Sequence, residues 1–471
     1  MRSSWRLAAP LVVWLAVVVI PRPLGLSRNA WSYLGLFAAV VVALVLEPLP
    51  PAAVGLVGLT LATVLGFISA KPAEAIKWGL SGFSDGTVWL IFGALVVSLG
   101  YEKTGLGRRI ALTLVKALGK SSLGLGYAVM LADLAIAPFT PSNTGRSAGV
   151  IYPIVRSIPA LYGSAPGPSA RRLGAYLMWT AFATTGVTSS MFLTALAPNL
   201  LAVSLIHQEI ALDLTWAQWS MGVLPIGTPL LVTLPVLVYF IYPPEIRASE
   251  QVPAWAAAEL VRMGPLSMPE RVMGLLVLLA FCLWVFGGAW INATTAILAI
   301  VSLMVLCRVV DWDDITGNRA AWNTVVYFAT LMTLADGLNR VGFITWAAQG
   351  VARLLVGASP VVALVGLVSF FFLVHYAFAS LTAHTVVVLP ALLAAGALFP
   401  GMPVKVFALL LAYSIGLMGV ITPYATGPAP VYFGSGFIPR KDFWMLGFVF
   451  GLIYLAVLLG VGIPWLGTCL S

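Results

Sequence analysis

The sequence predicts an all-α protein that crosses a membrane many times and is built as an inverted repeat. Hydrophobic residues make up 61% of the 471 residues and charged residues only 9%, whereas soluble domains contain about 25% charged residues. The mean hydropathy is +1.01, and apolar runs of about 20 residues, the length of a membrane-spanning helix, recur along the whole chain. One soluble core could not bury so many runs, so a polytopic membrane protein is expected.

The first apolar run follows Met1-Arg-Ser-Ser-Trp-Arg6 and ends at Ile20. Pro21-Arg22-Pro23 comes next, in place of the small residues of a signal-peptide cleavage site. An uncleaved helix is therefore expected over 5–20, within an N-terminal segment of residues 1–30.

The rest of the first half, residues 31–242, contains two apolar arms around a polar tip. The arms are 121–138 and 147–161, in a hairpin of about 121–161, and the tip is Thr140-Pro-Ser-Asn-Thr-Gly-Arg146. The other expected helices are 31–47, 52–70, 86–100 with an amphipathic continuation at 105–119, 173–206 with a break in the middle, and 217–241.

The least apolar stretch, 243–270, is expected to be a cytoplasmic linker, and residues 271–471 form the second half. Here the arms 360–379 and 385–399, in a hairpin of about 360–399, flank the tip Ser380-Leu-Thr-Ala-His384. The other expected helices are 272–289, 291–307, 321–336 with a continuation at 342–356, 403–430 with a break, and 443–467.

The two halves repeat in order and spacing. Phe92–Gly100 resembles Phe328–Asp336, and Thr194–Asn199 resembles Thr426–Pro430. With a cytoplasmic N-terminus, most of the 25 Lys and Arg residues fall on the inside, as the positive-inside rule requires. The first tip then enters from the inside and the second from the outside, which is the inverted repeat of many secondary transporters.

The same orientation explains the net charge of +9. Because the basic residues follow the topology, nucleic-acid binding is not expected. No Ser/Arg-rich transit peptide is visible, so a bacterial plasma membrane is expected in place of an organelle.

Polar residues at the two tips indicate a site for a solute. A polar turn at membrane depth is tolerated only where protein encloses it or where it lines an aqueous cavity. Each tip begins a short helix, whose free N–H groups attract anions, and hydroxyl and amide groups add donors. The alternative is that these residues are ordinary helix caps.

The two broken helices point to the same place. Gly186–Asn199 and Gly419–Pro430 combine Gly, Pro and Thr within apolar helices, and proline frees backbone groups by removing a hydrogen-bond donor. A simple packing kink is the alternative for each. Two tips and two breaks together indicate a site near the membrane midplane.

Three segments resemble the divalent anion/sodium symporter superfamily: Pro141–Ser147, Ser380–Thr385 and Val431–Gly436. The chain is most similar to the exchanger branch, which includes plastid 2-oxoglutarate/malate translocators and bacterial citrate– and tartrate–succinate antiporters. The resemblance covers nearly the whole chain and implies exchange of C4/C5 dicarboxylates such as 2-oxoglutarate, malate and succinate.

The resemblance also implies an architecture: a homodimer in the lipid bilayer, with about eleven spanning helices and two re-entrant hairpins in each chain. A scaffold (about 1–120 and 271–357) would support a transport domain (about 121–242 and 358–471) that moves like an elevator. By position, the residues implied to line the substrate site are Ser142, Asn143, Thr144, Ser380 and Thr382, with Thr194, Asn199, Thr426 and Gly427 from the broken helices.

One departure from the family pattern concerns sodium. The second tip of the family is commonly Ser-Asn-Thr, but Leu381 stands in place of the Asn and cannot coordinate sodium. Arg146 and His384 each lie at the fourth residue after a tip serine, and charged groups inside a membrane are usually functional. We hypothesise that these two groups replace the sodium ions of the symporters.

Such a fixed positive charge has a mechanistic consequence. An empty site would carry it uncompensated through the membrane, whereas a bound dianion would offset it, so sodium-independent, obligatory exchange is expected. The alternatives are that Arg146 reaches the inner surface and that His384 is a hydrogen-bonded core residue.

Other functions are less well supported. Cys282, Cys307, Cys469 and the three histidines, His207, His375 and His384, show no spacing of a metal site or disulfide framework, so no metal or cofactor is expected. No activated nucleophile suggests an enzyme. Asp133, Glu47 and Asp336 leave proton coupling open, although interface or helix-end roles are favoured. A sodium-coupled symporter is the nearest rival, and an ion channel or inorganic-anion carrier is a further alternative.

Overall fold

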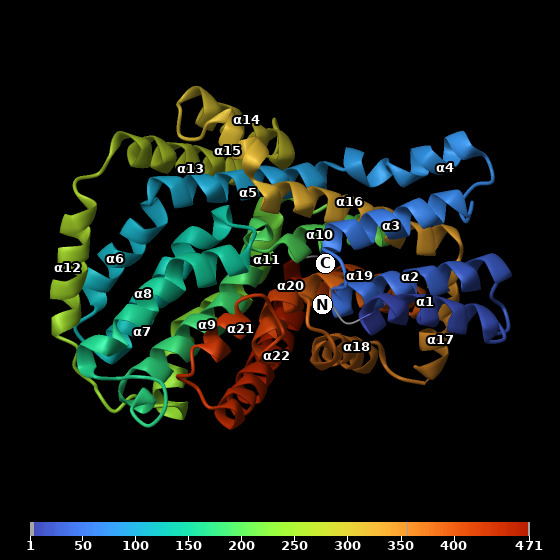
Figure 1. Ribbon diagram of the computed structural model, residues 1–471. Helices are drawn as coiled ribbons and strands as arrows, with labels where there is room; N and C mark the ends of the chain where they lie inside the picture. Colours follow the sequence, from blue (N-terminus) through green and yellow to red (C-terminus); the bar gives the residue numbers. More distant parts are fainter. Residues whose placement is uncertain (1–3, 356, 470–471) are drawn as a thin grey trace.

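The computed structural model describes residues 4–355 and 357–469, and it is helical almost throughout (Figure 1). Within these ranges the only β-type pairing is an isolated bridge between Ser121 and Ala248. The expected all-α class is therefore confirmed. The extreme ends of the expected segments 1–30, 342–356 and 271–471 lie outside the described residues.

The first half and the linker contain twelve α-helices among the described residues. These are α1 (Ser4–Val19), α2 (Arg28–Leu46), α3 (Pro51–Val64), α4 (Pro72–Gly79), α5 (Gly86–Thr104), α6 (Leu106–Leu118), α7 (Ser122–Ile136), α8 (Tyr152–Ser157), α9 (Gly174–Met191), α10 (Ala197–Ile210), α11 (Trp216–Ile241) and α12 (Gln251–Met263). A π-helix, Thr144–Ile151, joins the first tip to α8.

The second half continues the numbering. Its helices are α13 (Met268–Phe286), α14 (Ala293–Leu306), α15 (Trp312–Gly317), α16 (Arg319–Arg340), α17 (Phe343–Leu354), α18 (Pro360–Val374), α19 (Leu381–Leu398), α20 (Val404–Leu417), α21 (Ala429–Gly434) and α22 (Arg440–Cys469).

One expected helix end was wrong. The helix expected over 52–70 ends at Val64, because Gly66 adopts a left-handed conformation with φ of +65° that stops the helix. Within the expected linker 243–270 the chain forms α12, which packs against α6. Both expected breaks are present, between α9 and α10 and between α20 and α21.

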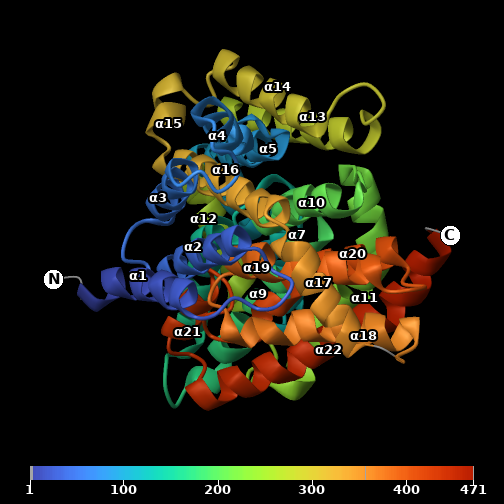
Figure 2. The same cartoon turned by 90° about the vertical axis from the view of Figure 1, so that its right-hand side faces the viewer.

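The length and composition of the helices fit a bilayer. Seven described helices are long and apolar enough to cross a membrane, and α1, α3, α14 and α20 are shorter apolar helices. Figure 2 shows the helices α1, α2, α18 and α22 running in roughly the same direction across the molecule. The chain is thus a multi-pass membrane protein, and eleven crossings stays a prediction.

The two halves present their elements in the same order. In the first half, α5 and the amphipathic α6 precede a hairpin, a broken helix and the long α11. In the second half, α16 and the amphipathic α17 precede a hairpin, a broken helix and the long α22. Both hairpins start with a serine cap: Ser121 Oγ accepts from Gly124 N at 3.0 Å, and Ser359 Oγ accepts from Val362 N at 3.4 Å.

The broken helices of the two halves cross in the centre of the protein. Ser190 Oγ of α9 donates to Tyr413 O of α20 at 2.8 Å. At Gly416 a Cβ atom would lie only 2.4 Å from Ser190 Oγ and 2.7 Å from the Ser190 nitrogen. Only glycine allows this approach, which brings the end of α9 and the end of α20 together.

Candidate functional site

The two tip serines act as helix caps. Ser142 Oγ accepts a hydrogen bond from Gly145 N at 3.0 Å, and Ser380 Oγ accepts one from Ala383 N at 3.3 Å. The capping alternative considered from the sequence is therefore correct for the acceptor side of each hydroxyl. Each hydroxyl keeps its own proton, which it can donate to a carboxylate, so substrate binding by these serines stays a prediction.

The first tip contacts the break of the second half. Asn143 Nδ2 donates to Thr426 Oγ1 at 2.7 Å, and both side chains are buried. At Gly427 a Cβ atom would lie 1.9 Å from Thr144 Oγ1, so glycine is required for Thr144 to sit against this backbone. Four of the residues implied to line the site are thus brought together.

The second tip contacts the same segment. His375 Nε2, at the end of the first arm of the hairpin, lies 2.8 Å from Ala425 O. A Cβ atom on Gly419 would lie 3.7 Å from Leu381 Cδ1 and 3.4 Å from Thr426 Cβ. The segment 418–428, between α20 and α21, therefore contacts both hairpin tips.

Ser380 and Thr382 open into a cavity of about 280 Å³. Its opposite wall comes from α16, through Asn323 and Tyr327, and from Glu47 after α2. The residues described as lining this cavity do not include the first tip. It lies between the second hairpin and helices of the expected scaffold.

Thr194 and Asn199 form hydrogen bonds to protein groups around the first break instead of facing an open space. Thr194 Oγ1 donates to Pro138 O and accepts from Trp216 Nε1 at 2.9 Å. Asn199 Nδ2 donates to Ser189 O at 2.7 Å, and both Thr194 and Asn199 are fully buried. These contacts tie the break to the first hairpin, and direct substrate contact by the two residues stays a prediction.

Arg146 is fully buried and all its N–H groups are directed at protein acceptors. Nε lies 3.2 Å from Asp133 Oδ1, an ion pair in which both side chains are at most 1% exposed. The remaining donors bind two main-chain carbonyls and two hydroxyls: Thr140 O at 3.1 Å, Ala195 O at 2.9 Å, Thr188 Oγ1 at 3.3 Å and Ser189 Oγ at 3.0 Å. The alternative that Arg146 reaches the inner surface is wrong.

The expectation of an uncompensated charge at Arg146 is also wrong for this arrangement. Asp133 on α7 supplies the opposite charge and also accepts from Thr188 Oγ1. The favoured interpretation of Asp133 as an interface or helix-end residue missed this role. The sequence did contain a signal for this pair: one acidic residue lies in the apolar first arm, and one basic residue lies at the end of the tip that follows it.

His384 is also fully buried, and it pairs with a second histidine. The Nδ1 atoms of His384 and His375 lie 3.1 Å apart. Because His375 Nε2 faces the Ala425 carbonyl, it must carry the proton, so His375 Nδ1 accepts from His384 Nδ1. His384 Nε2 then has a free lone pair and no partner among the described residues.

This geometry fits the alternative of a hydrogen-bonded core histidine. His384 lies between the rings of Phe371 and Phe378. No role was predicted for His375, although this residue links the second hairpin to the segment 418–428. A role of His384 in compensating substrate charge stays a prediction.

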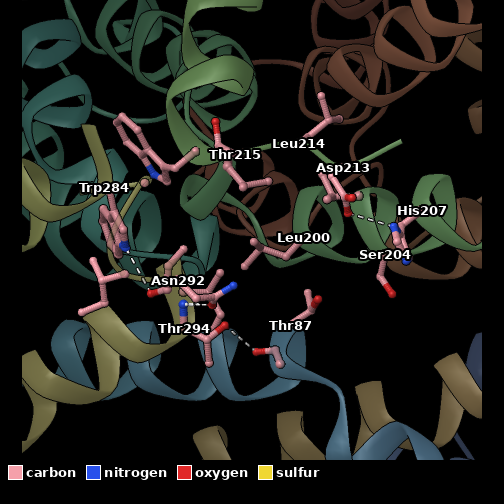
Figure 3. A pocket seen from close by; sticks show the side chains of 18 of the residues that line it. Thr87, Leu200, Ser204, His207, Asp213, Leu214, Thr215, Trp284, Asn292 and Thr294 are labelled. Carbon is pink, nitrogen blue, oxygen red and sulfur yellow. Dashed lines mark hydrogen bonds and ion pairs between the residues drawn. The ribbon is translucent and has the colours of Figure 1, made fainter. Parts of the chain in front are cut away.

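A larger crevice of about 480 Å³ lies beside the first broken helix (Figure 3). One wall comes from α5, α13 and α14, including Thr87, Trp284 and Asn292, and the other from α10 and the start of α11. His207 and Asp213 pair at its edge, with Nδ1 and Oδ1 2.9 Å apart. The crevice thus separates helices of the expected scaffold from helices of the expected transport domain.

Comparisons with known proteins fit this arrangement. A family model described as the sodium:sulfate symporter transmembrane region matches residues 1–471. An L-tartrate/succinate antiporter of Escherichia coli O6:K15:H31 (strain 536 / UPEC) is 45% identical over 480 residues, which cover 99% of this chain and 98% of that protein. An L-tartrate/succinate antiporter of Shigella sonnei (strain Ss046) is 45% identical over 479 residues, with the same coverage of both chains.

A solved structure shares the fold. The crystal structure of the Alcanivorax borkumensis YdaH transporter aligns with a TM-score of 0.56 and 16% sequence identity, over 89% of this chain and 98% of that chain. At this identity the likeness concerns the fold alone.

Proposed function

The chain belongs to the divalent anion/sodium symporter superfamily, whose sodium:sulfate symporter model spans it from end to end, and from this membership we propose that it exchanges C4/C5 dicarboxylates across the bacterial plasma membrane. It is a transporter and not an enzyme. One structural observation carries the proposal: the segment 418–428 contacts both hairpin tips, through Thr426 and Asn143 on one side and Ala425 and His375 on the other. Residues of both halves of the repeat therefore meet at this segment.

The relatives support the substrate class. L-tartrate and succinate, named for proteins that are 45% identical to this chain, are both C4 dicarboxylates. Ser142, Asn143 and Thr144 on the first tip, and Ser380 and Thr382 on the second, offer hydroxyl and amide donors for two separate carboxylates. 2-Oxoglutarate and malate are proposed as further substrates on the same chemistry.

We propose that transport is independent of sodium. Leu381 gives the second tip no amide oxygen with which to coordinate a cation. On the first tip, the Arg146 guanidinium donates to the carbonyl oxygens of Thr140 and Ala195, and these oxygens are the kind of ligand that a sodium ion needs. A protein cation thus takes a place that a symporter would fill with an ion.

Because Asp133 pairs with Arg146, the charge of Arg146 cannot act in exchange in the way that the sequence suggested. Arg146 and Asp133 together are formally neutral, so a net positive charge alone does not hold back the empty carrier. We propose that Arg146 holds the first tip in place, while hydroxyl groups of the two tips donate hydrogen bonds to a bound dianion. His384, with its free Nε2, is proposed as a second group that responds to the bound charge.

The proposed movement is that of an elevator in a homodimer. The transport domain, about 121–242 and 358–471, would slide against the scaffold, about 1–120 and 271–357. Two solvent-sized spaces along this boundary support the division: the crevice of about 480 Å³ and the cavity of about 280 Å³ at the second tip.

The test uses purified protein in proteoliposomes. Uptake of labelled succinate is measured into vesicles that contain succinate, L-tartrate, 2-oxoglutarate or no dicarboxylate, with external sodium or choline. Uptake is expected only into preloaded vesicles, at the same rate in both salts. Sodium-driven uptake into empty vesicles would identify a symporter instead, and competition by sulfate but not by dicarboxylates would identify an inorganic-anion carrier.

A further inference from the structure

A second space in the protein differs in chemistry from the site between the tips. It is a groove of about 820 Å³ between α13, the ends of α5 and α6, and the first arm of the first hairpin. Its walls are almost entirely apolar, with Leu134, Phe139 and Phe281 among the lining residues. Figure 1 shows α13 alongside α5, with α6 and α7 following.

The groove is open to the membrane on the side of α13. Leu275 and Leu278, which line it, are 67% and 62% exposed, and apolar side chains this exposed on a spanning helix face lipid. At Gly274 a Cβ atom would have no neighbour nearer than Leu106 Cδ2 at 4.0 Å. The space beside Gly274 is therefore large enough for a guest chain.

The depth of the groove matches one leaflet. From Arg271 to Phe281, α13 rises about 15 Å at ~1.5 Å per residue. This is half of the ~30 Å hydrocarbon core of a bilayer. At its inner end, aromatic rings close the groove: the centroids of Phe139 and Phe281 lie 6.5 Å apart, and those of Phe139 and Trp284 lie 6.2 Å apart. An acyl chain of one leaflet would fill this length and stop at the rings.

The mouth of the groove carries one available cation. Arg109 is neutralised by Glu270, with Nε and Oε1 2.5 Å apart and Nη2 and Oε2 3.1 Å apart. The Glu270 carboxylate at the mouth is thus already paired. Arg271 is exposed and has no ion-pair partner among the residues that the structure describes. An anionic headgroup would complement it.

We propose that this groove binds an anionic phospholipid of the cytoplasmic leaflet, with one acyl chain between α7 and α13 and its phosphate at Arg271. The bound chain ends beside Pro138 and Phe139, directly before the first tip. The lipid would therefore fill the space between the first hairpin and α13 without touching the residues proposed to hold the substrate.

The test measures lipid binding and needs no substrate. Delipidated protein is titrated with dioleoyl phosphatidylglycerol or dioleoyl phosphatidylethanolamine, and lipid adducts are counted by native mass spectrometry. The wild-type protein is expected to retain one phosphatidylglycerol per chain more tightly than phosphatidylethanolamine. Arg271→Gln should weaken phosphatidylglycerol binding about fivefold, the effect of one basic residue near the membrane surface. It should weaken phosphatidylethanolamine binding less, because the ammonium group of that lipid already balances its phosphate.

Two further variants test the groove itself. Gly274→Leu fills it from α13 and Ala135→Phe from α7, so each should abolish retention of both lipids; the second variant serves if the first does not fold. Arg319→Gln, at a cytoplasmic-side arginine that does not line the groove, is the matched control and should bind like wild type. Unchanged phosphatidylglycerol binding in Arg271→Gln, or unchanged binding of both lipids in the filled variants, would overturn the proposal.

Discussion

At the residue scale, the pair formed by Arg146 and Asp133 determines how the first tip is held. Both side chains are excluded from solvent, and Thr188 and Ser189 of α9 complete the set of contacts. Removing one partner from a buried ion pair leaves the other charge without compensation, which costs about 3–5 kcal/mol, whereas removing both can be nearly neutral. Stability and transport can therefore be separated by substituting the two residues singly and together.

We expect Asp133→Asn and Arg146→Gln each to lower the thermal unfolding temperature of the purified protein more than the double variant does. If the guanidinium is also needed for the substrate, the double variant should assemble in membranes but fail to exchange succinate. Thermal unfolding is followed by intrinsic fluorescence, and exchange is measured in proteoliposomes. If the losses in unfolding temperature of the two single variants add up in the double variant, the two charges do not depend on each other.

The sequence predicted the position of Arg146 but not its partner. Asp133 lies on the first arm of the hairpin and Arg146 at the end of its tip, so no helical spacing relates them, and the turn after Pro138 decides that they meet. The contact of Asn143 with Thr426 was accessible from sequence, because the family motifs place both residues at one site. The pairing of His375 with His384 was not, since it depends on side-chain directions across a turn.

At the element scale, the close contact of α9 with α20 holds the two broken helices together near their breaks. Gly416→Ala would place a methyl group 2.4 Å from Ser190 Oγ and 2.7 Å from its main-chain nitrogen. Because a backbone atom cannot move aside without shifting α9, we expect a loss of about 1–3 kcal/mol in stability, as in overpacked cores, and slower exchange.

The matched control for this prediction is Gly366→Ala in α18. There a Cβ atom would meet nothing within 4 Å, and alanine favours a helix over glycine by roughly 1 kcal/mol. The control should therefore unfold at the same or a higher temperature than wild type. Equal unfolding temperatures for the two variants would contradict the close crossing.

Long apolar runs and breaks could be predicted at this scale, but short surface elements could not. The Gly, Pro and Thr content located both breaks, and Gly105, with φ of +77°, separates α5 from α6 where the amphipathic continuation was expected. In contrast, α4, α12 and α15 lie in polar segments without a strong apolar period. The π-helix after the first tip also has no sequence signature, although such turns often occur at functional sites.

At the scale of the whole molecule, the repeat and its order followed from sequence, whereas the boundary between the proposed domains depends on packing. The crevice in Figure 3 lies along that boundary, and Ser204 Oγ of α10 lies 3.5 Å from Asp85 Oδ2, the cap of α5. This contact joins a helix of the proposed transport domain to one of the proposed scaffold. If the domains slide, the contact must break in each cycle.

A reversible cross-link at this contact tests the movement. In a protein whose exposed cysteines, Cys282, Cys307 and Cys469, are changed to serine, Asp85→Cys and Ser204→Cys are combined and bridged with mercuric ion. Exchange should stop and return on addition of dithiothreitol, because the bridge joins the two domains. The control is Gly86→Cys with Thr294→Cys, where a Cβ atom on Gly86 lies 3.5 Å from Thr294 Oγ1 and both residues belong to the proposed scaffold. The bridged control should keep exchanging, and full exchange by the bridged first pair would mean that α5 and α10 do not move apart during transport.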